Sequence, residues 1–263
     1  MAAERTSTRA NGRVSRVEQV MGTAVSFSLA TDDEPVARAA ISDAVAWLHH
    51  VDATFSTYKP ESPISQFGRG ELRAEDLSEE ILSVLDLCDL ARVETVGAFD
   101  ASAVKAPNGT SFDPSGLVKG WSVEGAVTVL ERHGFDDFTI NAGGDIAQRG
   151  GRWTTGIRHP ARSDQLAAVL EASGSLAIAT SAAYERGEHI VDPHTGEAPA
   201  VLTSVTIVGP DLTQADVWAT AVFVLGVDGI ALLPVGYDAF VIANDHMTFA
   251  TPGFDRYRVV PAT

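Results

Sequence analysis

Hydrophobic residues in the first half of the chain recur every three or four positions, the spacing of one helical face. A long amphipathic helix is expected to open at Pro35, because proline is favoured in the first helical turn. Asp76 and Glu79 have the spacing of a capping box and predict a second helix through Val93. The segment STYKPESPISQFGRGEL between them is interpreted as a loop from its composition. The apolar face of the first helix comprises Val36, Ala40, Ile41, Ala44, Val45, Leu48, Val51 and Phe55.

From Phe138 onward the pattern changes to short apolar runs separated by turn residues, which predicts strands. A third helix, from about Lys119 to His133 with Gly134 at its end, precedes this change. One more helix is expected among the strands, over Thr213–Gly226, and a strand through Val17–Leu29 is expected near the start of the chain. The later segments are FTINAGGDIAQRG, RWTTGIRHP, LAAVLEASGSLAIAT, HIVDPHTGEAP, TSVTIVG and a final hairpin, DAFVIANDHMTFATP.

This arrangement, with helices mainly in the first half and strands mainly in the second, predicts an α+β fold rather than a regular βαβ repeat. Residues 15–263 contain no internal repeat and no convincing linker, so a single compact domain is expected over this range. Residues 1–14 are polar and rich in Arg, Ser and Thr, and are expected to be disordered.

The charge of the chain limits the kinds of partner it can have. With 19 Lys and Arg against 35 Asp and Glu, the formal charge is −16, so neither nucleic acid nor anionic membrane is expected as the main partner. No apolar run reaches transmembrane length, and the N-terminus lacks the apolar region of a signal peptide. A cytoplasmic protein is therefore expected, with export of a longer form left open. Cys88, the one cysteine, is expected to be a small buried hydrophobe.

Asp216 and Thr220, in the segment QADVWATAVFVLG, are four residues apart and would stack on one face of the predicted helix. Carboxylate and hydroxyl oxygens beside packed residues suit a hard cation such as Mg²⁺. An Asp near a helix N-terminus and a Thr that bonds back to the preceding turn would have the same spacing. Taken alone, the pair favours this second, structural interpretation.

Three other segments carry residues that can hold a phosphate. SFDPSGLVKGW places Asp113, Gly116 and Lys119 at a junction of loop and helix, where N–H groups and an ammonium can bind phosphate oxygens. INAGGDIAQRG has two glycines that let a ligand approach the backbone, followed by Asp145. In EHIVDPHTGEAP, His189 can donate a hydrogen bond to phosphate or carry a proton near neutral pH. A plain junction, a hairpin turn and a structural histidine are the alternatives.

Aromatic side chains in GAFDAS and TYKP suit a planar heterocycle, although both segments can equally lie at the edge of the core. Several common sites find no support, because the chain has no Walker A loop, no G-x-G-x-x-G, no nucleophile elbow and no H-E-x-x-H.

The order and wording of these segments resemble the ApbE-type flavin transferases, the FAD:protein FMN transferases. The similar stretches include MGTAVSFSL, FSTYKPESPIS, GAFD, FDPSGLVKGW, INAGGDI and VTIVGPDLTQADVWATAVFVLG, and they extend over residues 20–226. The elements A-D-x-x-x-T and H-x-x-D-P-x-T-G are the most specific. The resemblance implies an α+β fold that binds FAD in an extended pocket, with Mg²⁺ at the pyrophosphate. It also implies transfer of FMN to a Ser or Thr hydroxyl of an acceptor flavoprotein, with release of AMP.

The resemblance also assigns individual residues. Asp216 and Thr220 would hold Mg²⁺, with the carbonyl of Gly116 as a third ligand. His189 would lie near the phosphates, and either His189 or Asp216 would act as the base for the incoming hydroxyl. The residues that would line the FAD are Met21, Tyr58, Ala98, Phe99, Asp100, Asp113, Lys119 and the backbone of Val191.

Two other functions remain open at the level of the sequence. Water in place of the protein hydroxyl would make the protein an FAD pyrophosphatase that yields FMN and AMP. A non-catalytic FAD-binding protein would keep the pocket without the transfer step. Retention of both Asp216 and Thr220 favours catalysis, whereas Gly68, at a position where the family usually has Asn, favours the binding protein.

Overall fold

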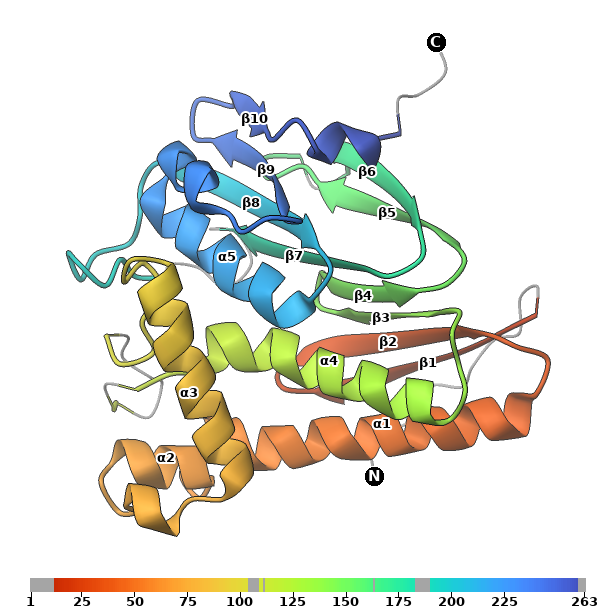
Figure 1. Cartoon of the computed structure of the whole chain (residues 1–263), viewed down its shortest axis with the longest axis horizontal. Coiled ribbons are helices and arrows are strands. Elements are labelled where there is room, and N and C mark those ends of the chain that lie inside the picture. The colour runs from red at the N-terminus through yellow and green to blue at the C-terminus, as the bar shows by residue number, and fades with distance from the viewer. Residues whose placement is uncertain (1–11, 104–108, 111, 163, 183–189, 260–263) are drawn as a thin grey trace.

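Among the described residues, the chain forms an eight-stranded antiparallel sheet (Figure 1). This computed structural model describes residues 12–103, 109–110, 112–162, 164–182 and 190–259. The strands lie in the order β1 (Arg13–Val20), β2 (Thr23–Ala30), β3 (Phe138–Ala142), β4 (Asp145–Arg149), β7 (Leu176–Ala182), β8 (Leu202–Gly209), β9 (Asp238–Ala243) and β10 (Thr248–Ala250).

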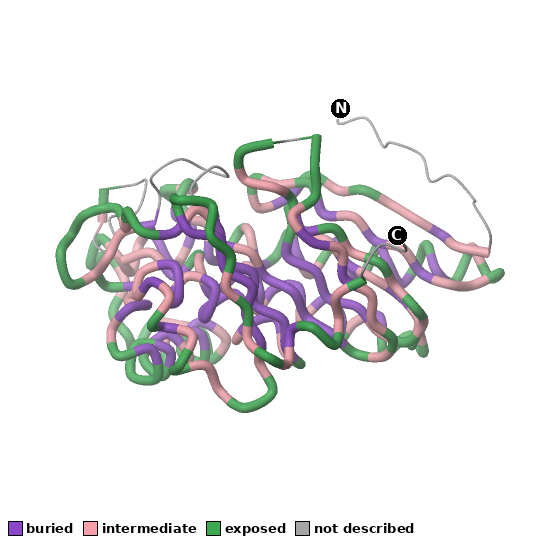
Figure 2. The backbone as a smooth tube through the Cα atoms, turned by 90° about the horizontal axis from the view of Figure 1, so that it is seen from above, coloured by how far each residue is buried: buried purple, intermediate pink, exposed green. Residues whose placement is uncertain are grey.

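Three helices, α1 (Glu34–Phe55), α4 (Ser115–Arg132) and α5 (Leu212–Leu225), lie side by side over one face of this sheet (Figure 1). Side chains from both layers form the largest core, in which Phe27 and Ile140 of the sheet are as fully buried as Leu48 of α1. Figure 2 shows the buried residues gathered in the interior and the exposed ones in the outer turns. Burial of apolar side chains between the layers is the main force that holds the helices on the sheet.

The other face of the sheet is covered by a two-stranded hairpin, β5 (Arg152–Arg158) and β6 (Leu166–Ser173), and by the short 3₁₀ helix η3 (Phe254–Arg256). Phe240 of β9 stacks on Phe254 with ring centroids 5.3 Å apart. Asp238, buried at the start of β9, accepts a hydrogen bond from Thr251 and pairs with Arg256. This second apolar cluster lies across the sheet from the three helices.

The predicted α+β fold and the single domain are confirmed, as are the first helix, the helix after residue 211 and the final hairpin. The apolar positions predicted for α1 are buried, except that Val36 in the first turn is 44% exposed. The third helix, α4, ends near Gly134, which has the left-handed φ of +85° typical of a helix terminus. It begins at Ser115, one turn earlier than predicted, where the carboxylate of Asp113 accepts the Ser115 N–H.

The predicted loop between α1 and the next helix contains a short helix, α2 (Pro63–Gly68), so its assignment as loop was wrong. Ser62 caps this helix by accepting the N–H of Ser65 at 3.1 Å, and Pro63 occupies the first turn. Serine and proline are also typical of loops, and composition alone therefore did not distinguish the two structures.

The predicted cap of the second helix was also wrong. Helix α3 (Glu79–Glu94) is capped by Ser78, whose hydroxyl accepts the N–H of Ile81. Asp76 belongs instead to a 3₁₀ turn, η1 (Ala74–Asp76), and its carboxylate accepts the N–H of Arg73. The Asp76 carboxylate and the Ser78 hydroxyl can both cap a helix, and Ser78 does so here because it directly precedes the first helical residue.

The strand predicted over Val17–Leu29 is a hairpin of β1 and β2. Its two-residue turn consists of Met21 and Gly22, with φ values of +54° and +70°. A tight turn of this kind requires positive φ at both positions, and Met gives no sequence signal for that conformation. Strand β1 begins at Arg13, so residues 13 and 14 belong to the sheet, while residues 1–11 lie outside the described part of the chain.

Cys88 on α3 is buried, as predicted, at 5% exposure. Burial raises the pKa of its thiol to about 12, so the thiol stays protonated at pH 8. We therefore expect no measurable reaction of the native protein with a thiol reagent such as DTNB at pH 8, and reaction of one thiol per chain in 6 M guanidinium. Rapid labelling of the native protein would contradict this burial.

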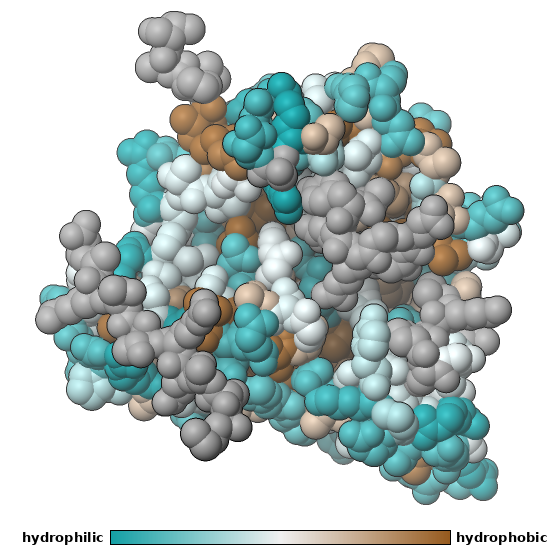
Figure 3. Space-filling model, turned by 180° about the vertical axis from the view of Figure 1, so that it is seen from behind, coloured by the Kyte–Doolittle hydropathy of each residue, from teal (hydrophilic) through white to brown (hydrophobic). Residues whose placement is uncertain are grey.

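In the part of the chain that the structure describes, no helix is long and apolar enough to cross a membrane. Among the coloured residues of the face seen from behind, most are hydrophilic to neutral and the apolar ones lie in small groups (Figure 3).

Candidate active site

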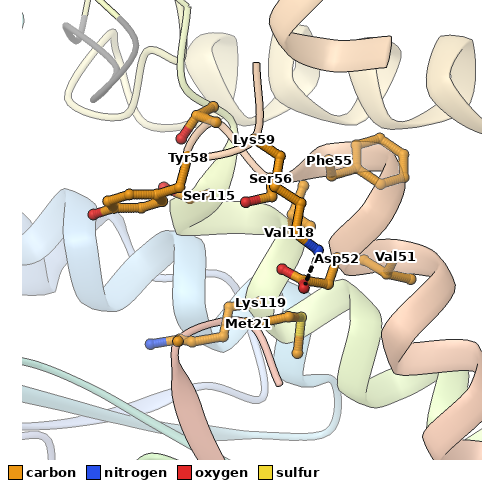
Figure 4. A pocket seen from close by; sticks show the side chains of 12 residues that line it. Met21, Val51, Asp52, Phe55, Ser56, Tyr58, Lys59, Ser115, Val118 and Lys119 are labelled. Atoms are coloured by element: carbon orange, nitrogen blue, oxygen red, sulfur yellow. Dashed lines mark hydrogen bonds and ion pairs between the residues drawn. The ribbon is translucent and has the colours of Figure 1, made fainter. Parts of the chain in front are cut away.

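A cavity of 560 Å³ opens between the β1–β2 turn, the end of α1 and the start of α4 (Figure 4). Its volume falls within the range of small-molecule sites, about 300–1,000 Å³. The lining residues are Met21, Gly22, Val51, Asp52, Phe55, Ser56, Thr57, Tyr58, Lys59, Ser115, Val118 and Lys119. Three of the residues predicted to line FAD, Met21, Tyr58 and Lys119, are therefore in its wall.

The wall of this cavity combines apolar and aromatic side chains from separate elements. The Ser122 hydroxyl on α4 contacts the thioether sulfur of Met21 at 3.5 Å, which ties the β1–β2 turn to the helix. Tyr58 follows α1 and is 74% exposed, an unusual position for a large aromatic ring. An exposed ring beside a cavity offers a stacking surface for a planar ligand.

An ion pair in the cavity was not predicted from the sequence. Lys59 Nζ lies 2.6 Å from Asp52 Oδ2, between the last turn of α1 and the segment after it. The two residues lie on different elements, so no helical spacing relates them. The ammonium of Lys119 points away from this ion pair, toward α5 and the sheet (Figure 4). The cavity therefore borders a second polar region beyond Lys119.

That region is a buried cluster of polar groups between α4, α5 and the sheet. Asp216 on α5 is 3% exposed, and its Oδ2 accepts the N–H of Gly120 at 3.0 Å. The Lys119 ammonium lies 3.8 Å from Asp216 Oδ1 and 2.5 Å from Oδ2 of Asp145 on β4. Glycine at position 120 lets α4 and α5 pack this closely, because a Cβ there would lie 2.5 Å from the carbonyl oxygen of Leu212.

The three residues predicted to bind a metal lie close together. Thr220 is one turn beyond Asp216 on α5, and its hydroxyl lies 3.4 Å from that of Ser181 on β7. A Cβ on Gly116 would lie 3.8 Å from Thr220 Oγ1, so the first turn of α4 packs against this hydroxyl. The fold thus brings Gly116 of α4 close to Asp216 and Thr220 of α5, which lie about 100 positions later in the chain.

The oxygen atoms of this cluster fit a hard divalent cation. One buried carboxylate, one hydroxyl and a backbone carbonyl are ligands that Mg²⁺ accepts when phosphate oxygens and waters complete its shell. Among the described residues, no group of three or more His, Cys, Asp or Glu side chains could hold a metal by itself. A cation here would therefore take its remaining ligands from water or from a bound substrate.

A partly buried glutamate, Glu124, fixes the start of α5 against α4. Glu124 Oε1 accepts the N–H of Leu212 at 2.7 Å, and Arg149 donates to Oε2 at 3.0 Å. Burial raises the pKa of the Glu124 carboxyl, and the two donors oppose this shift. Asp211 caps the same helix by accepting the N–H of Gln214. The helix that carries Asp216 is therefore held in register by polar contacts as well as by packing.

Four other residues predicted to contact the flavin, Ala98, Phe99, Asp100 and Asp113, are not among those that line the cavity. Ala98 and Phe99 are buried in the turn after α3, and a Cβ on Gly116 would lie 3.3 Å from the Phe99 ring. The carboxylates of Asp100 and Asp113 accept the N–H groups of the second residue after each. These bonds shape the two chain segments that precede α4.

The segment that contains the H-x-x-D-P-x-T-G element is described only in part. His189 lies outside the described residues, and Val191 is partly buried and is not in the cavity wall. The following loop packs against the turn before Phe99, because a Cβ on Gly97 would lie 3.2 Å from His194 Nε2. Asp192 accepts the backbone N–H of His194 at 2.9 Å, and this contact stabilises the loop.

Gly68, the departure from the expected Asn, ends α2 beside Thr110. A Cβ on Gly68 would lie 2.9 Å from the Thr110 hydroxyl, so an Asn side chain would require Thr110 to move. The position therefore lacks room for Asn in this packing.

Comparison with known proteins shows which sequences and structures this chain is similar to. The profile of the ApbE family matches residues 21–107 and 101–240. The FAD:protein FMN transferase of Treponema pallidum is 31% identical over 226 residues, which cover 74% of this chain and 62% of that protein. A protein of the same name from Klebsiella pneumoniae is 24% identical over 271 residues, which cover 79% of this chain and 77% of that protein. The chain thus spans less than two thirds of the length of the Treponema protein.

Solved structures share the fold. The flavin transferase ApbE from Vibrio cholerae superposes with a TM-score of 0.80 at 21% identity, over 93% of this chain and 99% of that chain. The ApbE protein from Thermotoga maritima superposes with a TM-score of 0.82 at 20% identity, over 94% and 100% of the two chains. At these identities the likeness establishes the architecture of the chain.

Proposed function

Because the chain belongs to the ApbE family, we propose that it transfers FMN from FAD to a Ser or Thr hydroxyl of an acceptor protein and releases AMP. The observation that carries this proposal is the junction of the cavity with the polar cluster at Lys119. On one side of Lys119 lie aromatic and apolar walls suited to a flavin ring. On the other side lie oxygen ligands suited to the charges of a diphosphate and its cation.

In this proposal, the flavin ring enters the cavity beside Tyr58 and Met21, and the diphosphate lies at the first turn of α4. The N-terminal end of a helix favours negative charge, and the ammonium of Lys119 would pair with a phosphate oxygen. The AMP half of FAD would extend from the first turn of α4 beyond the residues that line the cavity.

Mg²⁺, held by Asp216, Thr220 and the carbonyl of Gly116, would draw charge from the diphosphate and stabilise AMP as the leaving group. The N–H of Gly120 would keep the Asp216 carboxylate oriented during this step, because it already holds Oδ2. The acceptor hydroxyl must lose a proton as it attacks the phosphorus that carries the riboflavin, and Asp216 or His189 would receive it. Charge neutralisation and positioning, rather than a covalent enzyme intermediate, would carry most of the catalysis.

The test is an assay with two products. The protein is incubated with FAD, Mg²⁺ and a candidate acceptor with an exposed Ser or Thr, and AMP is measured by chromatography while covalent flavin fluorescence is followed on the acceptor. AMP with a fluorescent acceptor is the expected result. AMP and free FMN without labelled acceptor would replace the proposal with an FAD pyrophosphatase. Tight FAD binding without AMP would replace it with a non-catalytic FAD-binding protein.

A further inference from the structure

Asp145, the first residue of β4, is a buried carboxylate beside the proposed cation site. It is 1% exposed, and its Oδ1 accepts the N–H of Thr180 on β7 at 3.1 Å. Its Oδ2 is also buried, with no aligned hydrogen-bond donor among the described residues. The Lys119 ammonium at 2.5 Å therefore supplies the charge that compensates this oxygen.

Lys119 thus lies between two buried carboxylates at unequal distances. Its ammonium is 2.5 Å from Asp145 Oδ2 and 3.8 Å from Asp216 Oδ1. Since the attraction between charges falls with distance, Asp145 attracts the ammonium more strongly than Asp216 does. Without that carboxylate, the same ammonium would move toward Asp216 and occupy the space beside its oxygen.

We propose that Asp145 is a positioning residue that holds Lys119 away from Asp216 and so keeps Asp216 accessible to a divalent cation. The inference rests on the proposed function only in that Asp216 belongs to the cation site. Asp145 would also keep the ammonium at the edge of the cavity, where the diphosphate of FAD would lie. The carboxylate acts through Lys119 and does not contact the substrate.

A purely structural role for Asp145 can be separated from this one. Asn at position 145 retains an oxygen that can accept the Thr180 N–H, so the link between β4 and β7 is preserved. It removes the negative charge, however, and therefore releases the Lys119 ammonium. Asp238→Asn is the matched control, because Asp238 is also a buried, ion-paired aspartate but lies on β9 with Arg256.

The experiment measures binding of Mn²⁺ to the flavin-free protein by electron paramagnetic resonance, which detects the free ion. Asp145→Asn is expected to weaken Mn²⁺ binding about tenfold, the lower end of the loss that follows removal of a residue supporting a metal site. Asp238→Asn is expected to bind Mn²⁺ as the wild type does. Equal binding by wild type and Asp145→Asn would overturn the inference and leave the proposed function intact. No Mn²⁺ binding by the wild type would instead remove the cation site on which both rest.

A double variant tests whether the effect passes through Lys119. Lys119→Met removes the competing ammonium, so the variant with both Lys119→Met and Asp145→Asn is expected to regain Mn²⁺ affinity within about threefold of wild type. A double variant as weak as Asp145→Asn alone would show that Asp145 acts directly or through the fold, against the inference. Circular dichroism of each variant establishes that the proteins compared are folded.

Discussion

Asp216→Ala is expected to abolish turnover of FAD, with AMP release reduced at least about a thousandfold at saturating FAD and Mg²⁺. The substitution removes the one carboxylate among the three proposed cation ligands, and it leaves the Gly120 N–H without its present acceptor. Asp216→Asn separates these two effects, because its amide oxygen can still accept from Gly120 while the charge is lost. Both variants are expected to lose AMP release, and Asp216→Asn is expected to retain more stability.

The control for this prediction is again Asp238→Asn, which changes a buried aspartate on β9 and is expected to leave AMP release within about twofold of wild type. Rates are measured by chromatography of AMP over a range of Mg²⁺ concentrations, and urea unfolding shows how much of each protein is folded. Full activity of Asp216→Ala would remove Asp216 from the cation site.

Gly120→Ala is expected to lower the free energy of unfolding by about 3 kcal/mol, the upper range for inserting a methyl group into a packed interface. The new Cβ would lie 2.5 Å from the carbonyl oxygen of Leu212 and 3.0 Å from the Cβ of Asp216. The first of these atoms is backbone at the start of α5, so no rotamer change can relieve the contact. The two helices must separate, and the bond between the Gly120 N–H and Asp216 would lengthen with them.

Urea denaturation measures this loss, with Thr128→Ala as the control on the same helix. Thr128 is exposed, and its replacement is expected to change the free energy of unfolding by no more than about 0.5 kcal/mol. If Gly120→Ala were as stable as the control, α4 and α5 would not be packed as closely as described. AMP release by the folded fraction of Gly120→Ala is also expected to fall, since Asp216 would be displaced.

Much of the fold was predictable because burial follows simple periods in this chain. Leu48 and Val51 lie on the buried face of α1, as their spacing predicted. Val36 has the same spacing but is exposed, because it lies in the first turn of the helix. Helix α2 and the β1–β2 turn were missed because their signals are local and ambiguous. Ser62 and Pro63 suit a loop as well as a helix start. Methionine rarely adopts a positive φ, so Met21 gave no signal for the turn.

The candidate site was predictable only where its residues share one element or a recognisable motif. Asp216 and Thr220 are one helical turn apart, so their proximity followed from spacing alone. The contact between Lys119 and Asp145 joins α4 to β4 and depends on which strand lies beneath the helix. Asp52 and Lys59 meet around the end of α1, where the path of the chain after the helix decides the distance. The residues of each contact lie on different elements, so no regular spacing in the sequence predicts that they meet.

Met21 has a left-handed backbone conformation, which lowers the stability of the fold, while its side chain contributes to the cavity. A non-glycine residue in this conformation costs on the order of 1 kcal/mol, which glycine would relieve. The same glycine would remove the side chain that forms part of the cavity wall and contacts Ser122. Selection of variants for heat resistance alone would therefore favour a change here that impairs the pocket, so a stabilised form of this protein is best engineered with Met21 held constant.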